Sequence, residues 1–125
     1  MVRMLISAAA LLAVWSQAAL ASQTACVFSG SQAPHYYELE FIGYSDVNPM
    51  VVFSSTAFGS GARFTLSPAN YTLKRFSQKA KSVSLDFRNP QDPALPPSFD
   101  LVGRRGRAKL KIGSIVTEGD LKCEP

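Results

Sequence analysis

Apolar residues recur at every second position in several segments of the sequence, and this alternation constrains the fold more than any other feature. In residues 82–88, Val83, Leu85 and Phe87 alternate with polar or charged side chains. Successive side chains of a β-strand point to opposite faces, so this spacing predicts a strand with one buried face. No run of useful length has the spacing of an amphipathic helix. The sequence therefore predicts an all-β fold.

Further alternating segments are separated by residues that favour turns. Gly59-Ser60-Gly61 predicts a chain reversal, and the four prolines within residues 89–97 predict a loop. Gly113-Ser114 predicts a two-residue hairpin, which places Ile112 opposite Ile115 and Lys109 opposite Glu118. Together with the segment above we expect about eight or nine short strands, including the segments 35–44, 50–58, 62–66, 70–76, 99–104, 107–112, 115–118 and 121–123.

The chain of 125 residues is long enough for one ordinary domain. A sheet with one apolar face must cover that face, which predicts either an antiparallel sandwich or a small barrel. Both architectures use the same alternation, so the pattern leaves the choice between them open.

The chain contains only two cysteines, Cys26 and Cys123. An even number of cysteines is expected to form disulfides where a chain is exported, as the first residues of this sequence predict. The sequence lacks the C-x-x-C pair that is typical of a redox-active site. A disulfide requires Cα atoms within about 7 Å of each other. We therefore expect the first and last strands to be neighbours, with the termini of the domain tied by one bond.

The first residues have the pattern of a targeting signal. Arg3 precedes the apolar run 5–15, and Ala19 and Ala21 form a small-x-small cleavage motif. The run is shorter than the about 20 residues that a membrane-spanning helix needs. The sequence thus predicts a cleaved signal peptide at 1–21 and one exported β-domain at 22–125, periplasmic or secreted, without a transmembrane segment in the mature chain.

Charge is distributed unevenly along the mature chain. Residues 63–111 contain eleven basic residues against three acidic ones, whereas residues 22–62 contain three acidic residues and no basic one. A basic segment of this size predicts either a surface for an anionic partner or a set of solvated strand faces.

The densest group of cations lies on one predicted hairpin and consists of Arg104, Arg105, Arg107, Lys109 and Lys111. Guanidinium groups match phosphate and carboxylate oxygens in bidentate geometry. For an exported protein, the expected anions are envelope polymers, lipid headgroups or an acidic protein. Export and the absence of a base-stacking motif argue against nucleic acid.

Groups suited to catalysis are few. His35 is the only histidine, and no G-x-S-x-G motif accompanies it. With both thiols expected in a disulfide, no set of ligands for a metal or cofactor remains. Glu38 and Glu40 share a strand face at about 7 Å, a separation compatible with glycoside hydrolysis, although such glutamates are usually solvated. We expect a protein that is not an enzyme.

Residues 59–83 resemble a known family, the periplasmic inhibitors of c-type lysozyme, which are small exported β-barrels. Ser60-Gly61-Ala62-Arg63-Phe64 is similar to the family's Ser-Gly-x-x-Tyr motif, with Phe64 in place of tyrosine. Residues 76–80 are similar to its aromatic-x-Lys-Gly segment, with Ala80 in place of glycine. The resemblance implies that Ser60 and Lys79 would enter the lysozyme cleft.

Three functions are therefore compatible with the sequence. The leading hypothesis is a non-catalytic exported domain that binds an anionic envelope component or a protein through basic residues. The alternatives are a lysozyme inhibitor that uses Ser60 and Lys79, and a small glycan-acting hydrolase that uses Glu38 and Glu40. A barrel that holds a lipid or another small ligand also remains open.

Overall fold

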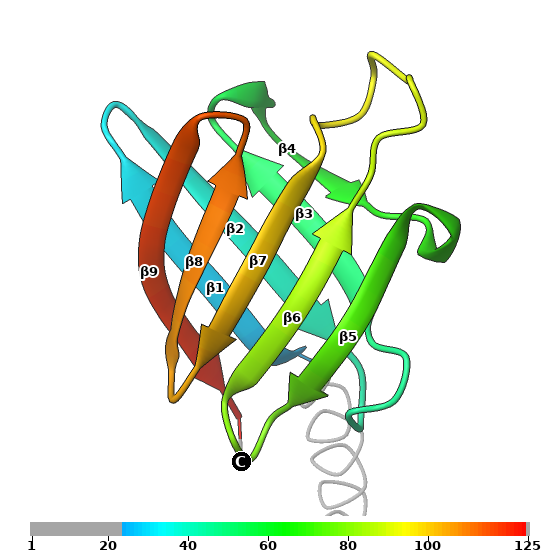
Figure 1. Cartoon of the computed structure of the whole chain (residues 1–125), viewed down its shortest axis with the longest axis vertical. Coiled ribbons are helices and arrows are strands. Elements are labelled where there is room, and N and C mark those ends of the chain that lie inside the picture. The colour runs from blue at the N-terminus through cyan, green and yellow to red at the C-terminus, as the bar shows by residue number, and fades with distance from the viewer. Residues whose placement is uncertain (1–23, 125) are drawn as a thin grey trace, which may run out of the picture.

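The computed structural model describes residues 24–124, and the predicted signal peptide at 1–21 lies outside them. These residues form nine antiparallel strands of one sheet, which confirms the all-β prediction (Figure 1). The strands are β1 (Thr24–Gln32), β2 (His35–Ile42), β3 (Met50–Ser55), β4 (Phe58–Thr65), β5 (Tyr71–Ser77), β6 (Ser82–Phe87), β7 (Phe99–Arg104), β8 (Arg107–Ile112) and β9 (Ile115–Cys123). Between β4 and β5 lies a short 3₁₀ helix, η1 (Pro68–Asn70). Nothing in this part of the chain is a helix long and apolar enough to cross a membrane.

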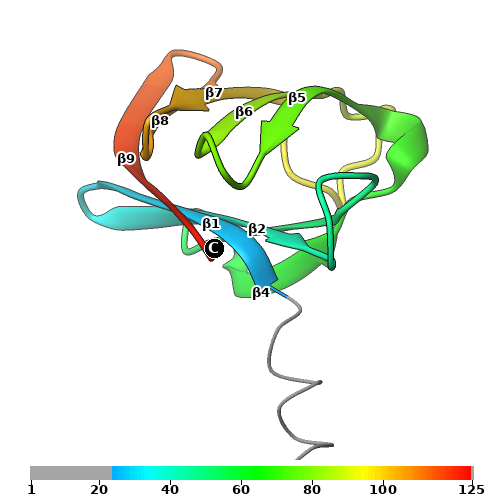
Figure 2. The same cartoon turned by 90° about the horizontal axis from the view of Figure 1, so that it is seen from below.

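The sheet curls into a half-barrel. Its strand order is β4-β3-β2-β1-β9-β8-β7-β6-β5, so the first and last strands pair at its centre. The two edges are β4 and β5, which follow each other in the chain but do not pair. Viewed from below, β1–β4 and β5–β9 lie as two facing layers (Figure 2). The sequence pattern did not distinguish a sandwich from a barrel. The structure has features of both, because one continuous sheet forms two facing layers that are joined on one side through β1 and β9.

Strand β9 connects the two layers because its halves pair with different neighbours. Residues Ile115 to Asp120 pair with β8, and Gly119 to Cys123 pair with β1. The sequence predicts a separate short strand at 121–123, but the structure has one continuous strand instead. A single strand can pass from one layer to the other where it bends, as at the corners of orthogonally packed sheets.

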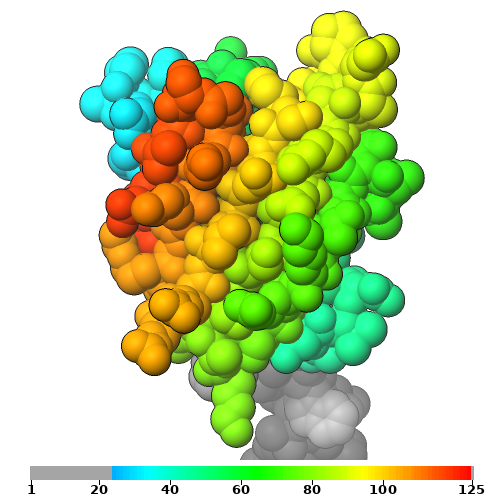
Figure 3. Space-filling view, in the orientation of Figure 1, coloured from blue at the N-terminus to red at the C-terminus, as the bar shows by residue number. Residues whose placement is uncertain are grey.

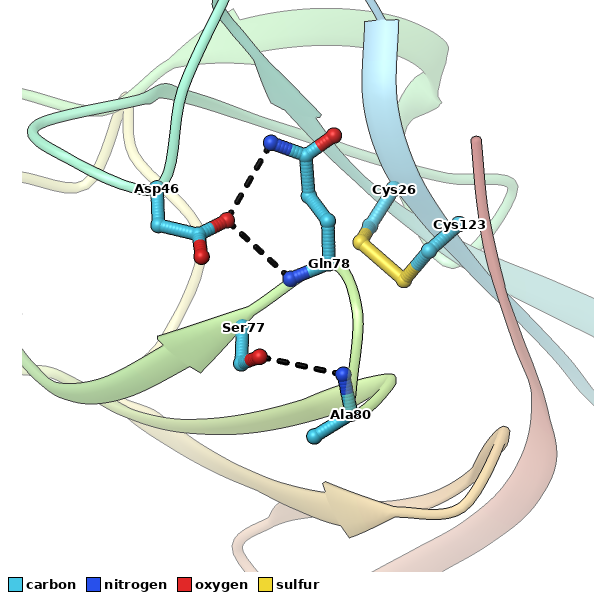
Figure 4. The surroundings of a disulfide bond; sticks show 6 residues. All are labelled: Cys26, Asp46, Ser77, Gln78, Ala80 and Cys123. Carbon is cyan, nitrogen blue, oxygen red and sulfur yellow. Dashed lines mark hydrogen bonds between the residues drawn. A yellow bond between two sulfur atoms is a disulfide. The ribbon is translucent and has the colours of Figure 1, made fainter. Parts of the chain in front are cut away.

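The disulfide between Cys26 and Cys123 is confirmed. The two residues are directly opposite each other in the β1–β9 ladder, with their Cα atoms 4.0 Å apart (Figure 4). The bond closes a segment with a sequence separation of 97 residues. It therefore ties the first strand to the last at the side where the half-barrel is closed by backbone hydrogen bonds.

The core lies between the two layers and consists of the alternating apolar residues. The predicted inward residues of β2 and β6 are buried, namely Tyr37, Leu39, Phe41, Val83, Leu85 and Phe87. Stacked rings join the layers, because Phe53 of β3 stacks on Phe99 of β7 at 5.3 Å. Burial of one such side chain contributes about 1.5–3 kcal/mol, so these rings stabilise the packing of one layer on the other.

The β3–β4 hairpin differs from the prediction. The chain reverses at Thr56 and Ala57, and Gly59-Ser60-Gly61 lies within β4. The hydroxyl of Ser55 donates to the carbonyl of Tyr36 at 2.7 Å and accepts from the amide of Ala57 at 3.0 Å. This side chain fixes the turn without glycine, which is why glycine spacing pointed to the wrong place.

The other predicted turns are confirmed. Ile112 pairs with Ile115 and Lys109 with Glu118, as the Gly113-Ser114 hairpin requires. Gly113 has a φ of 58°, a conformation that glycine adopts without strain. Residues 88–98, which include the four prolines, form no strand.

The β4–β5 connection (66–70) carries the chain from one layer to the other, and the remaining connections between strands gather at two ends of the sheet (Figure 1). We call one the disulfide end: it contains the β2–β3 loop (43–49), the β5–β6 turn (78–81), the β7–β8 turn (105–106) and the Cys26–Cys123 bond. The opposite end contains the turns at 33–34, 56–57 and 113–114 and the loop 88–98.

Candidate functional site

The predicted basic hairpin is β7–β8, and its pairing with β9 neutralises part of its charge. Arg107 lies opposite Asp120 and binds its carboxylate at 2.7 Å. Lys109 lies opposite Glu118, with 3.9 Å between Nζ and the carboxylate oxygen. The hairpin has no acidic residue of its own at 104–111, but the fold supplies acidic partners from the neighbouring strand.

Lys111 lies apart from the remaining hairpin cations. It is opposite Asp100 near the far end of β8, and Asp100 binds Arg88 at 2.9 Å. Arg104 and Arg105 lie at the β7–β8 turn, where both are exposed. Within residues 24–124, neither of these two arginines forms an ion pair.

The disulfide end brings two further cations beside this turn. The amide of Gly106 donates to the carbonyl of Lys81 at 3.2 Å, which joins the β7–β8 turn to the β5–β6 turn. Lys79 and Lys81 are exposed, and no acidic side chain of the described part of the chain pairs with them. Lys81 was not among the sequence-predicted binding residues. Antiparallel hairpins place alternate turns at the same end, so strand order could have indicated it.

A groove of about 720 Å³ lies at this end, between the β2–β3 loop and the β5–β6 turn. Its lining is formed by Tyr44, Ser45, Asp46, Gln78, Lys79, Lys81, Cys123 and Glu124. The backbone and side-chain amides of Gln78 both donate to Asp46, at 3.0 and 3.1 Å (Figure 4). Both bonds go to Oδ1 of Asp46, and no ion pair joins this carboxylate to Lys79 or Lys81.

A second groove, of about 530 Å³, lies on the outer face of the basic hairpin. Its basic lining residues are Arg75, Arg104, Arg107 and Lys109, and Glu118 lies among them. Of these four cations, Arg107 and Lys109 form the ion pairs described above. Among residues 24–124, six cations of the two hairpins form no ion pair. Four of them lie at the disulfide end (Lys79, Lys81, Arg104 and Arg105), whereas Arg75 lines the outer groove and Lys111 lies near the far end of β8. Arg104 also borders the outer groove.

Ser60 lies in a segment that protrudes from β4. Phe58 pairs with Ser55 and Arg63 pairs with Ser54, so residues 59–62 have no partner in the β3–β4 ladder. Ser60 is exposed and has a φ of 55°. This segment adjoins Tyr36 at the start of β2, whereas Lys79 lies near Tyr44 beyond its end. The structure therefore places Ser60 and Lys79 at opposite ends of the sheet.

The candidate catalytic groups lie on the outer face of β2 and at its start. Glu40 accepts a 2.6 Å hydrogen bond from Arg63, which makes it one half of an ion pair. Glu38 lines a polar groove of about 390 Å³ together with Arg107 and Asp120. The ring Nδ1 of His35 lies 3.2 Å from the hydroxyl of Thr56. Across residues 24–124, no three His, Cys, Asp or Glu side chains form a group that could hold a metal ion.

Fold and site together define a class of protein: a disulfide-tied β half-barrel with unpaired cations at one end. Comparison of the chain with protein-family models, curated proteins and solved structures gives no match. The function must therefore be argued from the site itself.

Proposed function

We propose that the protein is an exported, non-catalytic β-domain that binds an anionic component of the cell envelope through basic residues at the disulfide end. The observation that carries this proposal is the hydrogen bond from Gly106 to Lys81, which joins two turns with unpaired cations. Those cations are Lys79, Lys81, Arg104 and Arg105.

The contrast between paired and unpaired cations favours this end over the outer face of the hairpin. A ligand that binds Arg107 or Lys109 must compete with Asp120 or Glu118, which are already in contact. A ligand at the disulfide end displaces no such partner. Because salt screens exposed charges, binding of an anionic ligand to these cations should weaken as the salt concentration rises.

The absence of catalysis is part of the proposal, and the outer face of β2 supports it. Hydrolysis by paired carboxylates needs both groups available to the substrate. Arg63 holds Glu40 at 2.6 Å, and Glu38 shares its groove with Arg107.

Immobilised polyphosphate and polyglutamate test the proposal with phosphate and carboxylate probes. Arg105→Ser/Lys81→Ser and Arg107→Ser/Lys109→Ser each remove one arginine and one lysine, so they are matched in charge. We expect the first variant to bind about thirtyfold more weakly, because each of its two missing cations would contribute about 1 kcal/mol near an anionic surface. The second variant should lose much less. Equal losses, or no retention of the unmodified protein at low salt, would overturn the proposal.

A second candidate function, inhibition of a c-type lysozyme, is supported by the protruding segment 59–62. The ring of Phe64 lies so close beneath Gly59 that a Cβ atom there would be 2.8 Å from it. This packing supports the exposed Ser60, and the Ser-Gly-x-x-aromatic motif would then form the inserting loop. Lys79 lies at the other end of the sheet, so this candidate relies on Ser60 alone. Lysozyme inhibition lost in Ser60→Asn and kept in Lys79→Glu would support this candidate, and no inhibition would exclude it.

A further inference from the structure

The β2–β3 loop has highly exposed apolar side chains. Tyr44 and Val47 are 73% and 72% exposed, and Met50 directly after the loop is 49% exposed. The remaining large exposed apolar residues of the described chain are scattered over other elements: Tyr36, Val102 and Val116. Tyr44 borders the groove beside Lys79, whereas Met50 borders a separate groove with Leu66 and Tyr71. Exposed apolar side chains gathered in one segment of a folded domain indicate an interaction surface.

The loop is held in place rather than loosely attached. Asp46 accepts from both amides of Gln78, which fixes the loop to the β5–β6 turn (Figure 4). Inside the loop, the amide of Val47 donates to the hydroxyl of Ser45 at 3.2 Å. The exposed apolar side chains are thus pre-organised, and a partner need not supply the free energy to order them.

The cations of the disulfide end lie beside this loop. Lys79 and Lys81 line the same groove as Tyr44, and the Gly106–Lys81 hydrogen bond adds the turn with Arg105. Figure 3 shows the β5–β6 and β7–β8 turns projecting at the lower end of the molecule, with the β2–β3 loop on the same side. The acidic residues that line the groove are Asp46, which Gln78 holds, and Glu124.

From this arrangement we infer that the disulfide end docks on the surface of an anionic lipid bilayer. Tyr44 and Val47 would enter the interface, while Lys79, Lys81, Arg104 and Arg105 would contact headgroup phosphates. The inference rests on the proposed function for these cations and adds the nature of the partner. Apolar side chains flanked by cations suit a bilayer, where acyl chains lie beneath a layer of phosphates. Tyrosine favours the same interface because its ring is apolar and its hydroxyl polar.

One further observation favours a bilayer over a protein partner. Thr24 pairs with Ile42, directly before the loop, so the predicted signal peptide would join the domain at this end. Before cleavage, a signal peptide inserted in the membrane would hold this end toward the bilayer.

The test compares vesicles of phosphatidylcholine with vesicles that also contain about 30 mol % phosphatidylglycerol, an anionic lipid. The full chain is expressed with its own N-terminus and used as the host processes it. Val47→Ser removes an apolar side chain from the loop, and Val102→Ser removes one from the exposed face of β7 as a matched control. We expect the unmodified protein to bind only the anionic vesicles. Val47→Ser should bind them about fivefold to tenfold more weakly, and Val102→Ser should bind as the unmodified protein does.

Polyphosphate retention separates this inference from the proposed function. Val47→Ser keeps every cation, so its retention on polyphosphate should be unchanged. Equal vesicle binding by Val47→Ser and Val102→Ser, with polyphosphate retention intact, overturns the membrane inference alone. If the unmodified protein is not retained on polyphosphate, the proposed function and the membrane inference are both overturned. Self-association that is lost in Val47→Ser, without vesicle binding, would assign the loop to a second copy and also overturn the inference.

Fluorescence provides a second measurement that does not depend on weakened binding. The only tryptophan of the sequence is Trp15, within the predicted signal peptide. Val47→Trp therefore places a reporter in the loop of the processed chain, and Val102→Trp places one on β7. The emission of Val47→Trp should shift to the blue with anionic vesicles, and that of Val102→Trp should not. Equal emission of Val47→Trp with and without vesicles would contradict insertion of the loop.

Discussion

Gly119 of β9 lies against the carbonyl group of Ser29 in β1, so closely that a Cβ atom on Gly119 would overlap the carbonyl oxygen. Gly119 is also opposite Gly30 in the β1 ladder and opposite Ala108 in the β8 ladder. It therefore stands where β9 passes from one layer to the other. The close approach of the backbones at this point requires a residue without a side chain.

The first prediction concerns this contact. Gly119→Ala should lower the free energy of unfolding by about 2–3 kcal/mol or more, because the β1–β9 ladder must separate to admit the methyl group. Urea unfolding followed by circular dichroism measures the change. Gly43→Ala is the matched control, since a Cβ there meets no atom closer than 3.6 Å. If both variants unfold alike, the two strands do not approach as closely as described.

The second prediction concerns Thr117, which is 1% exposed and whose hydroxyl has no hydrogen-bond partner among residues 24–124. An unsatisfied buried polar group costs about 1–3 kcal/mol. Thr117→Val keeps the shape and removes the hydroxyl, so it should raise the free energy of unfolding by about 1 kcal/mol. Thr72→Val, at an exposed position of β5, should change stability much less. A destabilised Thr117→Val would show that the hydroxyl has a partner in solution.

The third prediction concerns the disulfide. In the chain-entropy model, closure of a loop of about 100 residues stabilises the folded state by up to roughly 4–5 kcal/mol. Cys26→Ser/Cys123→Ser should therefore unfold at a clearly lower urea concentration than the oxidised protein. The unmodified protein in reductant should approach the same midpoint. Similar midpoints for all three samples would show that pairing of β1 with β9 suffices to close the half-barrel.

Much of the fold follows from local sequence. Val83, Leu85 and Phe87 alternate with polar residues, and this spacing identifies the buried face of β6 without knowledge of the partner strand. The curl of the sheet depends on β9, where Gly119 faces two strands at once. That requirement depends on residues far away in the sequence, and local alternation does not contain it. The position of the β3–β4 turn was missed for a similar reason, because Ser55 fixes it by contact with Tyr36.

The candidate site was predictable only in part. Arg104 and Arg105 were identified from the local density of cations, and the structure leaves them without ion-pair partners among residues 24–124. Arg107 belongs to the same dense group, but Asp120 pairs with it from the next strand. Lys81 joins the site from another hairpin through Gly106. Local counting of charge does not reveal which cations lie beside acids of a neighbouring strand, because strand register determines that.

The last prediction concerns the acid stability of β5 and β6, where Lys74 binds Asp86 at 2.7 Å. The hydrogen bond from Lys74 is the main cause that lowers the pKa of Asp86 below its ordinary value of 3.8, with smaller contributions from Asp100 and Arg88 against the opposing effect of burial. A lowered pKa in the folded state means that the unfolded state binds protons first as the pH falls. The stabilisation is therefore present above pH 3.8 and is lost as the pH falls through the lowered pKa.

Lys74→Met should raise the pKa of Asp86 in an NMR titration and should unfold more easily at pH 7, with the difference from the unmodified protein vanishing in stronger acid. Lys111→Met removes the same charge without a bound carboxylate and should leave the pKa of Asp86 nearly unchanged, so an equal shift in both variants would contradict the role of the Lys74 contact.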